Sequence, residues 1–162
     1  MTEHSGADCQ AEFKQAMPEK PWNHTAVTKF EPLINLIDQR TQSDMFRHQG
    51  KYETNGDYYD IAHDLDDNNQ DKGSKTFENG VRAQIEQVEG WPTKIILEDD
   101  KAHLKETVAM DPSNHRIESD KVEFCGVSRE RTFSQYGESF RAYHFPGGSV
   151  EKSSSLPVLK LE

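Results

Sequence analysis

Residues 95–110, with the sequence IILEDDKAHLKETVAM, hold the clearest structural signal in the chain. An apolar run at Ile95–Leu97 is followed by a polar turn at residues 98–101, and hydrophobic residues then alternate with polar ones from Leu104 to Met110. Alternation on either side of a polar turn is typical of a β-hairpin with one buried face. We therefore take this hairpin as the start of an antiparallel sheet.

The alternation continues toward the C-terminus. Turn-forming residues at 111–114 are followed by alternating segments at 116–127, 129–136 and 139–145, which end at Pro146-Gly147-Gly148. Together with the hairpin, these segments predict a sheet of four to five strands. The serines at 153–155 predict a joint before a last apolar stretch.

Helical spacing dominates the first half of the chain. Residues 11–17 predict a short helix, and a longer amphipathic helix begins at Phe30, with apolar positions at Leu33, Ile34 and Ile37. A third helix is predicted over 77–88 from the stripe Phe77, Val81, Ile85 and Val88. Between them, residues 45–59 suggest a hairpin, and the polar sequence at 64–76 predicts a mobile acidic loop.

This order predicts an α+β fold, with N-terminal helices packed on a C-terminal antiparallel sheet of four to five strands. We expect a disordered leader at 1–10 and one domain at 11–162. The layout is similar to that of cone-shaped domains of the nuclear-transport-factor and polyketide-cyclase type, whose curved sheet encloses a pocket. A calycin-like β-barrel is the alternative.

Composition and charge narrow the function classes. Hydrophobic residues make up 33% of the 162 residues and the mean hydropathy is −0.93, which excludes a coiled coil, collagen or a membrane-spanning chain. The net charge is −10, and residues 1–90 hold most of the excess, with 17 acidic and 9 basic residues. Such a field repels nucleic acid and anionic membranes and favours a basic protein partner.

The two cysteines, Cys9 and Cys125, are too few for a disulfide framework, and Cys9 falls in the predicted leader. The first ten residues contain no apolar signal segment. Free thiols without a signal favour a reducing compartment, so we predict a cytoplasmic protein.

Two patterns suggest metal ligands. A calcium loop would use oxygen ligands at positions 1, 3, 5 and 12, which are Asp67, Asn69, Asp71 and Glu78. Lys72 occupies position 6, where the bend of such a loop normally needs glycine. A helix would also bring Asp60, His63 and Asp64 onto one face. Lys72, together with the polar Ser74 at position 8, disfavours calcium, and one helix face supplies at most three ligands for the second pattern, so we predict no metal and no cofactor.

Candidate catalytic residues gather in the last two predicted strands. Within the first of these strands, alternation places Arg129 and Arg131 on the same face. Within the second, it places Arg141 and Tyr143 on the same face and His144 on the opposite one. In a concave sheet the arginines would hold an anion, and Tyr143 or His144 would transfer protons. On a solvent face the arginines would instead pair with Glu123, Glu130 and Glu138 across strands. Cys125, in a predicted strand, is expected to be an inert core residue.

Two functions follow from these patterns, and the sequence leaves open whether the protein is an enzyme. The first is a small acidic binding protein that neutralises or regulates a basic macromolecule, as immunity proteins and phage inhibitors do. Its docking residues would be Asp57, Asp60, Asp64, Asp66, Asp67 and Asp71. The second is a pocket domain that binds a small molecule, either as a carrier or as an isomerase, dehydratase or cyclase using Arg141, Tyr143 and His144.

Overall fold

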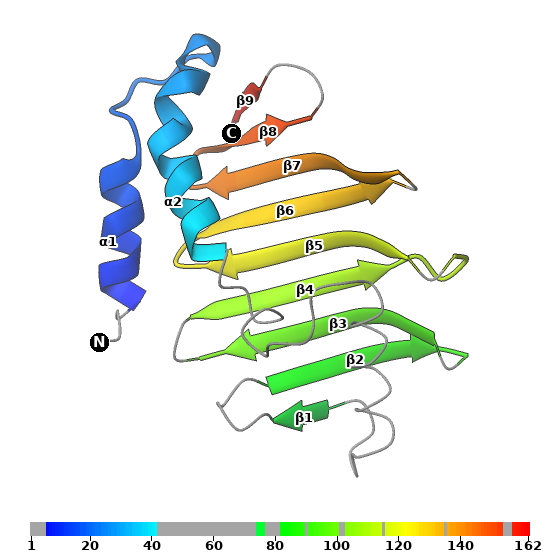
Figure 1. Ribbon diagram of the computed structural model, residues 1–162. Coiled ribbons are helices and arrows are strands. Elements are labelled where there is room, and N and C mark those ends of the chain that lie inside the picture. Colours follow the sequence, from blue (N-terminus) through cyan, green and yellow to red (C-terminus); the bar gives the residue numbers. More distant parts are fainter. Residues whose placement is uncertain are drawn as a thin grey trace.

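The computed structural model describes residues 6–41, 74–76, 82–89, 91–100, 103–114, 116–134, 136–153 and 157–162. The helical elements are α1 (Gly6–Ala16), the 3-10 helix η1 (His24–Phe30) and α2 (Glu31–Thr41) (Figure 1). The strands are β1 (Ser74–Thr76), β2 (Arg82–Val88), β3 (Trp91–Asp99), β4 (Leu104–Met110), β5 (Ile117–Phe124), β6 (Val127–Ser134), β7 (Gly137–Phe145), β8 (Gly148–Lys152) and β9 (Val158–Leu161).

The nine strands form one sheet in sequence order, and each is antiparallel to the next (Figure 1). Within the described residues the sheet is an open meander whose ends are β1 and β9. The predicted sheet of four to five strands is therefore wrong, and so are the cone-shaped layout and the closed barrel. Two of the missed strands, β8 and β9, have five and four residues, too few to show a clear alternation.

The helix predicted over 77–88 is also wrong, because the described part of that segment, residues 82–88, is strand β2. Its apolar residues recur with a period of two as well as with a helical period. Ala83 and Ile85 pair with Leu97 and Ile95 of β3. These backbone partners make the segment a strand and not a helix. Val88 completed the predicted helical stripe, yet its side chain is 54% exposed.

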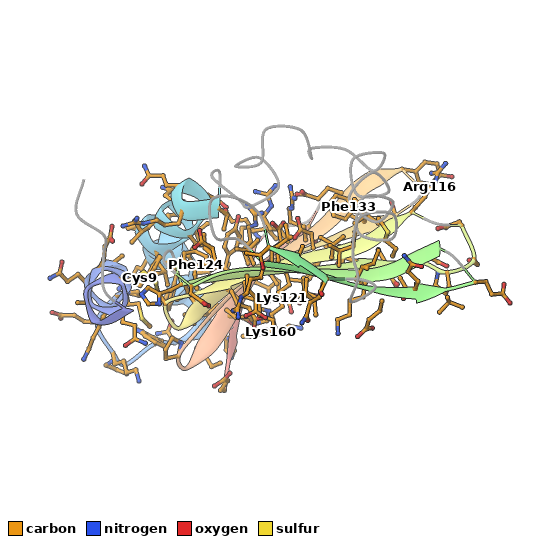
Figure 2. All side chains as sticks on the ribbon, turned by 90° about the horizontal axis from the view of Figure 1, so that it is seen from below. Cys9, Arg116, Lys121, Phe124, Phe133 and Lys160 are labelled. Carbon is orange, nitrogen blue, oxygen red and sulfur yellow. A yellow bond between two sulfur atoms is a disulfide. The ribbon has the colours of Figure 1, made fainter. Side chains whose placement is uncertain are left out.

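The two faces of the sheet differ in character. In the view of Figure 2, α2 lies on one side of the sheet, whereas Lys121 and Lys160 belong to the other side. That other side carries ion pairs such as Arg82–Glu98 at 3.1 Å and Lys160–Glu151 at 3.0 Å. An antiparallel sheet with one packed and one solvated face accounts for the alternation seen in the sequence.

The amphipathic helix predicted from Phe30 is confirmed as α2. Leu33, Ile34 and Ile37 are at most 1% exposed and pack in a cluster with residues of β5 to β9. Phe30, at the end of η1, is fully buried and stacks on Phe145 of β7 with ring centroids 4.8 Å apart. This cluster is the part of the core that the described helices cover.

Helix α1 lies beyond the ends of the strands, next to α2 (Figure 1). A disulfide joins its Cys9 to Cys125, with the Cα atoms 5.6 Å apart, and Phe13 meets the ring of Phe124 edge-on at 5.3 Å. The helix begins at Gly6, inside the segment predicted as a disordered leader. The prediction of two free cysteines is wrong, so the argument from free thiols to a cytoplasmic location no longer holds.

None of the helices in the described part of the chain is long and apolar enough to cross a membrane.

Candidate functional site: a groove between α1 and the β5–β6 turn

The turn between β5 and β6 is unusually constrained. Phe124 pairs with Val127, so Cys125 and Gly126 form a two-residue turn, with φ angles of +53° and +80°. Two left-handed residues are typical of a type I′ hairpin turn, which favours Asn-Gly. Cysteine rarely adopts this conformation, and here its sulfur is bonded to α1. The turn and the helix are therefore fixed to each other.

A groove of about 630 Å³ opens between α1, the connection at residues 17–22, the β5–β6 turn and Pro146. Its walls are mainly apolar and include Phe13, Met17, Pro18, Trp22 and Val127. Its polar side chains are Gln10, Lys14, Glu19 and Lys20. Both the size and the largely apolar lining are typical of sites that bind small molecules.

Trp22 forms a fixed wall of this groove. Its indole Nε1 donates a hydrogen bond to the carbonyl oxygen of Pro18 at 2.9 Å, and its ring meets Phe30 and Phe145 edge-on. The ring lies so close to Gly147 that a Cβ there would come within 2.8 Å of it. Gly147 also has a φ of +99°, so glycine is needed both for the turn and for the approach of the ring.

We expect Gly147→Ala to lower the free energy of unfolding by about 2–4 kcal/mol, because it adds backbone strain and overpacks the Trp22 ring. Gly137→Ala is the matched control, since φ is +117° there and a Cβ would meet no atom within 4 Å. Urea denaturation of both variants separates the two effects. Equal losses would mean that the Trp22 ring yields easily and is no fixed wall.

The rim of the groove is positively charged although the whole chain is acidic. Lys14 and Lys20 are accompanied by Glu19, in a protein whose net charge is −10. The Lys20 ammonium lies 4.9 Å from the centroid of the Trp22 ring, a cation–π contact that holds it beside the apolar wall. An anionic group bound at this rim would meet an attractive local field.

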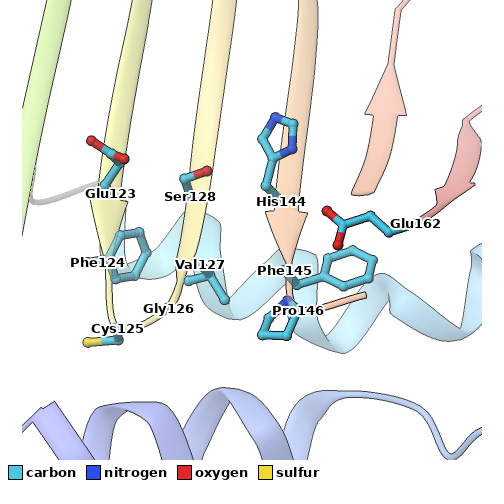
Figure 3. A pocket seen from close by; sticks show the side chains of 10 residues that line it. All are labelled: Glu123, Phe124, Cys125, Gly126, Val127, Ser128, His144, Phe145, Pro146 and Glu162. Carbon is cyan, nitrogen blue, oxygen red and sulfur yellow. The ribbon is translucent and has the colours of Figure 1, made fainter. Parts of the chain in front are cut away.

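A second hollow, of about 530 Å³, lies on the other side of the same turn (Figure 3). Its polar side chains are Glu123, Ser128, His144 and Glu162, and Cys125 also lines it. Its lining combines two carboxylates with four apolar side chains, so it suits an anionic ligand less well than the groove does. Among the described residues, no cluster of three His, Cys, Asp or Glu side chains could hold a metal ion.

The structure brings two of the predicted catalytic residues together, since Arg141 Nη1 donates to the Tyr143 hydroxyl at 3.4 Å, but it places His144 apart from them. Tyr143 and Arg141 lie on the face that α2 covers, whereas His144 is exposed on the opposite face. The Tyr143 hydroxyl donates to the Asp38 carboxylate at 2.8 Å, and Arg141 donates to Glu138 at 2.7 Å. Neither Tyr143 nor Arg141 lines the groove or the second hollow.

The neighbouring arginines also hold α2 in place. Arg129 is only 6% exposed, and its Nη1 donates to the Thr41 hydroxyl at 2.5 Å. Burial lowers the pKa of its guanidinium. Arg131 bonds the buried Asp120 at 2.7 Å. Arg129 therefore ties the C-terminal end of α2 to β6, and the Arg131–Asp120 pair joins β6 to β5, so both arginines have structural roles.

The buried hydroxyl of Tyr143 predicts a loss of stability at alkaline pH. Burial, together with the Asp38 carboxylate, raises its pKa from 10.0 to about 12. The group therefore stabilises the fold fully below about pH 10, and this contribution disappears as the pH rises toward 12. Between pH 9 and 12 the wild type should lose about 2–3 kcal/mol more than Tyr143→Phe in chemical denaturation. Parallel pH profiles for the two proteins would contradict this.

The predicted docking and calcium residues lie outside the described residues. They are Asp57, Asp60, Asp64, Asp66, Asp67, Asn69, Asp71 and Glu78, and His63 of the second metal pattern lies there as well. The sequence reasoning missed the groove itself. The available signal was Phe13 and Lys14 near the end of one short helix and Met17 just after it, followed by a tryptophan in a proline-flanked loop.

No protein-family model, curated protein or solved structure matches this chain.

Proposed function

We propose that this protein binds a small amphipathic anion in the groove between α1 and the β5–β6 turn. The observation that carries the proposal is the combination of an apolar lining with two lysines at the rim. An alkyl or aryl body would lie on Phe13, Met17 and Trp22, with its acidic group near Lys14 and Lys20. This is the carrier form of the pocket hypothesis.

The energetics favour such a ligand. Each methylene group removed from water contributes about 0.8 kcal/mol, so a medium-length chain supplies most of the affinity. Each contact to an exposed lysine ammonium adds up to about 1 kcal/mol, and the two lysines together select anions over neutral or cationic ligands.

Dodecanoate is a suitable probe, with dodecanol and dodecyltrimethylammonium as neutral and cationic controls. We expect calorimetry to show one site that prefers dodecanoate. The double variant Lys14→Glu/Lys20→Glu should weaken dodecanoate binding at least tenfold, by about 1.4 kcal/mol or more, and leave dodecanol binding nearly unchanged. Lys105→Glu is the matched control, because that lysine is exposed on β4 and lies outside the groove.

Fluorescence gives a second readout. The chain has two tryptophans, so Trp91→Phe leaves Trp22 as the only indole. Its emission should shift as dodecanoate fills the groove. Equal binding of the anionic and cationic probes, or an unchanged Trp22 signal at saturation, would contradict the proposal.

The other hypothesis, neutralisation of a basic macromolecule, stays a prediction. Its aspartates lie outside the described residues, and the solvated face of the sheet mixes both signs of charge. If it is correct, neutralising two or three of these aspartates should slow association with a basic partner, and high salt should do the same. Surface plasmon resonance at low and high salt would check this.

A further inference from the structure

We propose that the Cys9–Cys125 disulfide is a thiol-exchange site whose reduction releases α1 and opens the groove. The proposal adds redox control to the ligand binding proposed above. Only the dodecanoate measurement rests on that proposed function. It follows from three features of the structure: how α1 is attached, where Cys125 is exposed, and the conformation in which Cys125 is held.

Helix α1 is one wall of the groove and makes few other contacts with the part of the chain that the structure describes. It contributes Gln10, Phe13 and Lys14 to the lining. Besides the disulfide, it is held by the buried ring of Phe13 and by an ion pair between Glu12 and Arg40, both about one-third exposed. A partly exposed pair of this kind contributes little.

Because α1 is short, it depends on the disulfide to stay docked. A helix of 11 residues is marginal in water when it stands alone. Its ordering therefore depends on docking, which among the described residues rests on Phe13, Ala16, the Glu12–Arg40 pair and the disulfide. Once the bond is broken, α1 is the element with the least to keep it in place, whereas α2 retains its buried aliphatic stripe and its polar contacts to β6 and β7.

Cys125 is the sulfur that a reductant can reach. Cys9 is 7% exposed, whereas Cys125 is partly exposed and lines both the groove and the second hollow. Figure 3 shows Cys125 at the tip of the turn, beside α1. A thiolate entering from either hollow therefore meets Cys125 before Cys9.

The exchange needs a dithiol of the dithiothreitol or thioredoxin class. Its thiolate attacks the Cys125 sulfur, the S–S bond breaks, and Cys9 leaves as a thiolate that takes a proton from water. The second thiol of the reductant then displaces Cys125 from the mixed disulfide. The reductant ends as a disulfide, and the protein gains two electrons and two protons as two thiols.

The backbone at Cys125 supports a role for its sulfur. A φ of +53° is unfavourable for cysteine, and asparagine or glycine would fill this turn position with less strain. A residue kept in a strained conformation points to a need for its side chain. Asparagine at this position would preserve the turn and remove only the bond, which makes Cys125→Asn a clean test variant.

The test is hydrogen exchange on the full chain, oxidised and then reduced with dithiothreitol. We expect exchange in residues 10–16 of α1 to rise at least tenfold on reduction, while α2 and the β5–β7 amides stay protected. Cys125→Asn should show the same pattern without reductant, and reoxidation of the wild type should restore protection. Unchanged α1 exchange, or loss of protection throughout the protein, would overturn the proposal.

Dodecanoate calorimetry on the same samples completes the test. Reduction should weaken binding at least tenfold, and Cys125→Asn should bind as the reduced wild type does. If reduction releases α1 but dodecanoate still binds as tightly, the claim that the disulfide controls binding in the groove is wrong. Failure of the oxidised protein to bind dodecanoate would overturn the proposed function, and hydrogen exchange would still decide whether reduction releases α1.

Discussion

Replacing Phe30 with alanine should lower the free energy of unfolding by about 3–5 kcal/mol, the range for a large aromatic residue in a packed core. Phe30 is fully buried at the junction of η1 and α2. Its ring stacks on Phe145 and meets Trp22 edge-on at 5.2 Å. Truncation therefore leaves a cavity between the helices and the sheet, and it removes support from the tryptophan wall of the groove.

Urea denaturation of Phe30→Ala is the measurement, and Ile37→Ala, also fully buried, should lose about 2–5 kcal/mol. Val88→Ala is the control, because its side chain is 54% exposed and should change stability by less than about 0.5 kcal/mol. A loss below about 1 kcal/mol at both buried sites would mean that this cluster is not the core. The sequence also predicts a large loss for Trp91→Ala, a position whose side chain lies outside the described residues.

The sequence predicted elements whose signal is local. The stripe Leu33, Ile34 and Ile37 fits only a helical period, and α2 forms there. Strand β3 follows from its apolar run and β4 to β7 from alternation between clear turn signals, since each strand pairs with its neighbour along the chain. Segments with two possible periods were misread, as β2 shows. Whether such a segment forms a helix or a strand depends on its partner strand, and a partner cannot be identified from local spacing.

The groove depended on distant contacts and could not be predicted in this way. It joins residues 10–22 to residues 125–127 and Pro146. Tyr143 and Asp38, which share a hydrogen bond, are 105 residues apart, and the two cysteines are separated by 116. With only two cysteines, the sequence allowed a bond or two free thiols, and only the approach of α1 to the β5–β6 turn distinguishes them.

Removing the disulfide with Cys9→Ser/Cys125→Asn should lower the free energy of unfolding by about 3–5 kcal/mol. The bond closes a loop across a sequence separation of 116, and restricting so long a loop in the unfolded chain accounts for about 5 kcal/mol when the native state is unchanged. The loss of unfolding free energy stays within this range because the native state without the bond can relax to a form in which α1 is undocked. The m value, which is the slope of the unfolding free energy against denaturant concentration, should also fall slightly, since α1 no longer buries surface.

Guanidinium denaturation of three samples checks this expectation: the oxidised wild type, the reduced wild type and the double variant. The last two should lie close together, with the double variant slightly the more stable, because asparagine suits the left-handed turn position better than the reduced cysteine does. Cys9→Ser/Cys125→Ser should be slightly less stable than the asparagine variant, since serine is less suited to a φ of +53°. A loss below about 1 kcal/mol on reduction would show that the bond does not restrain the unfolded chain, and α1 would then need a stronger attachment than Phe13 and one ion pair provide.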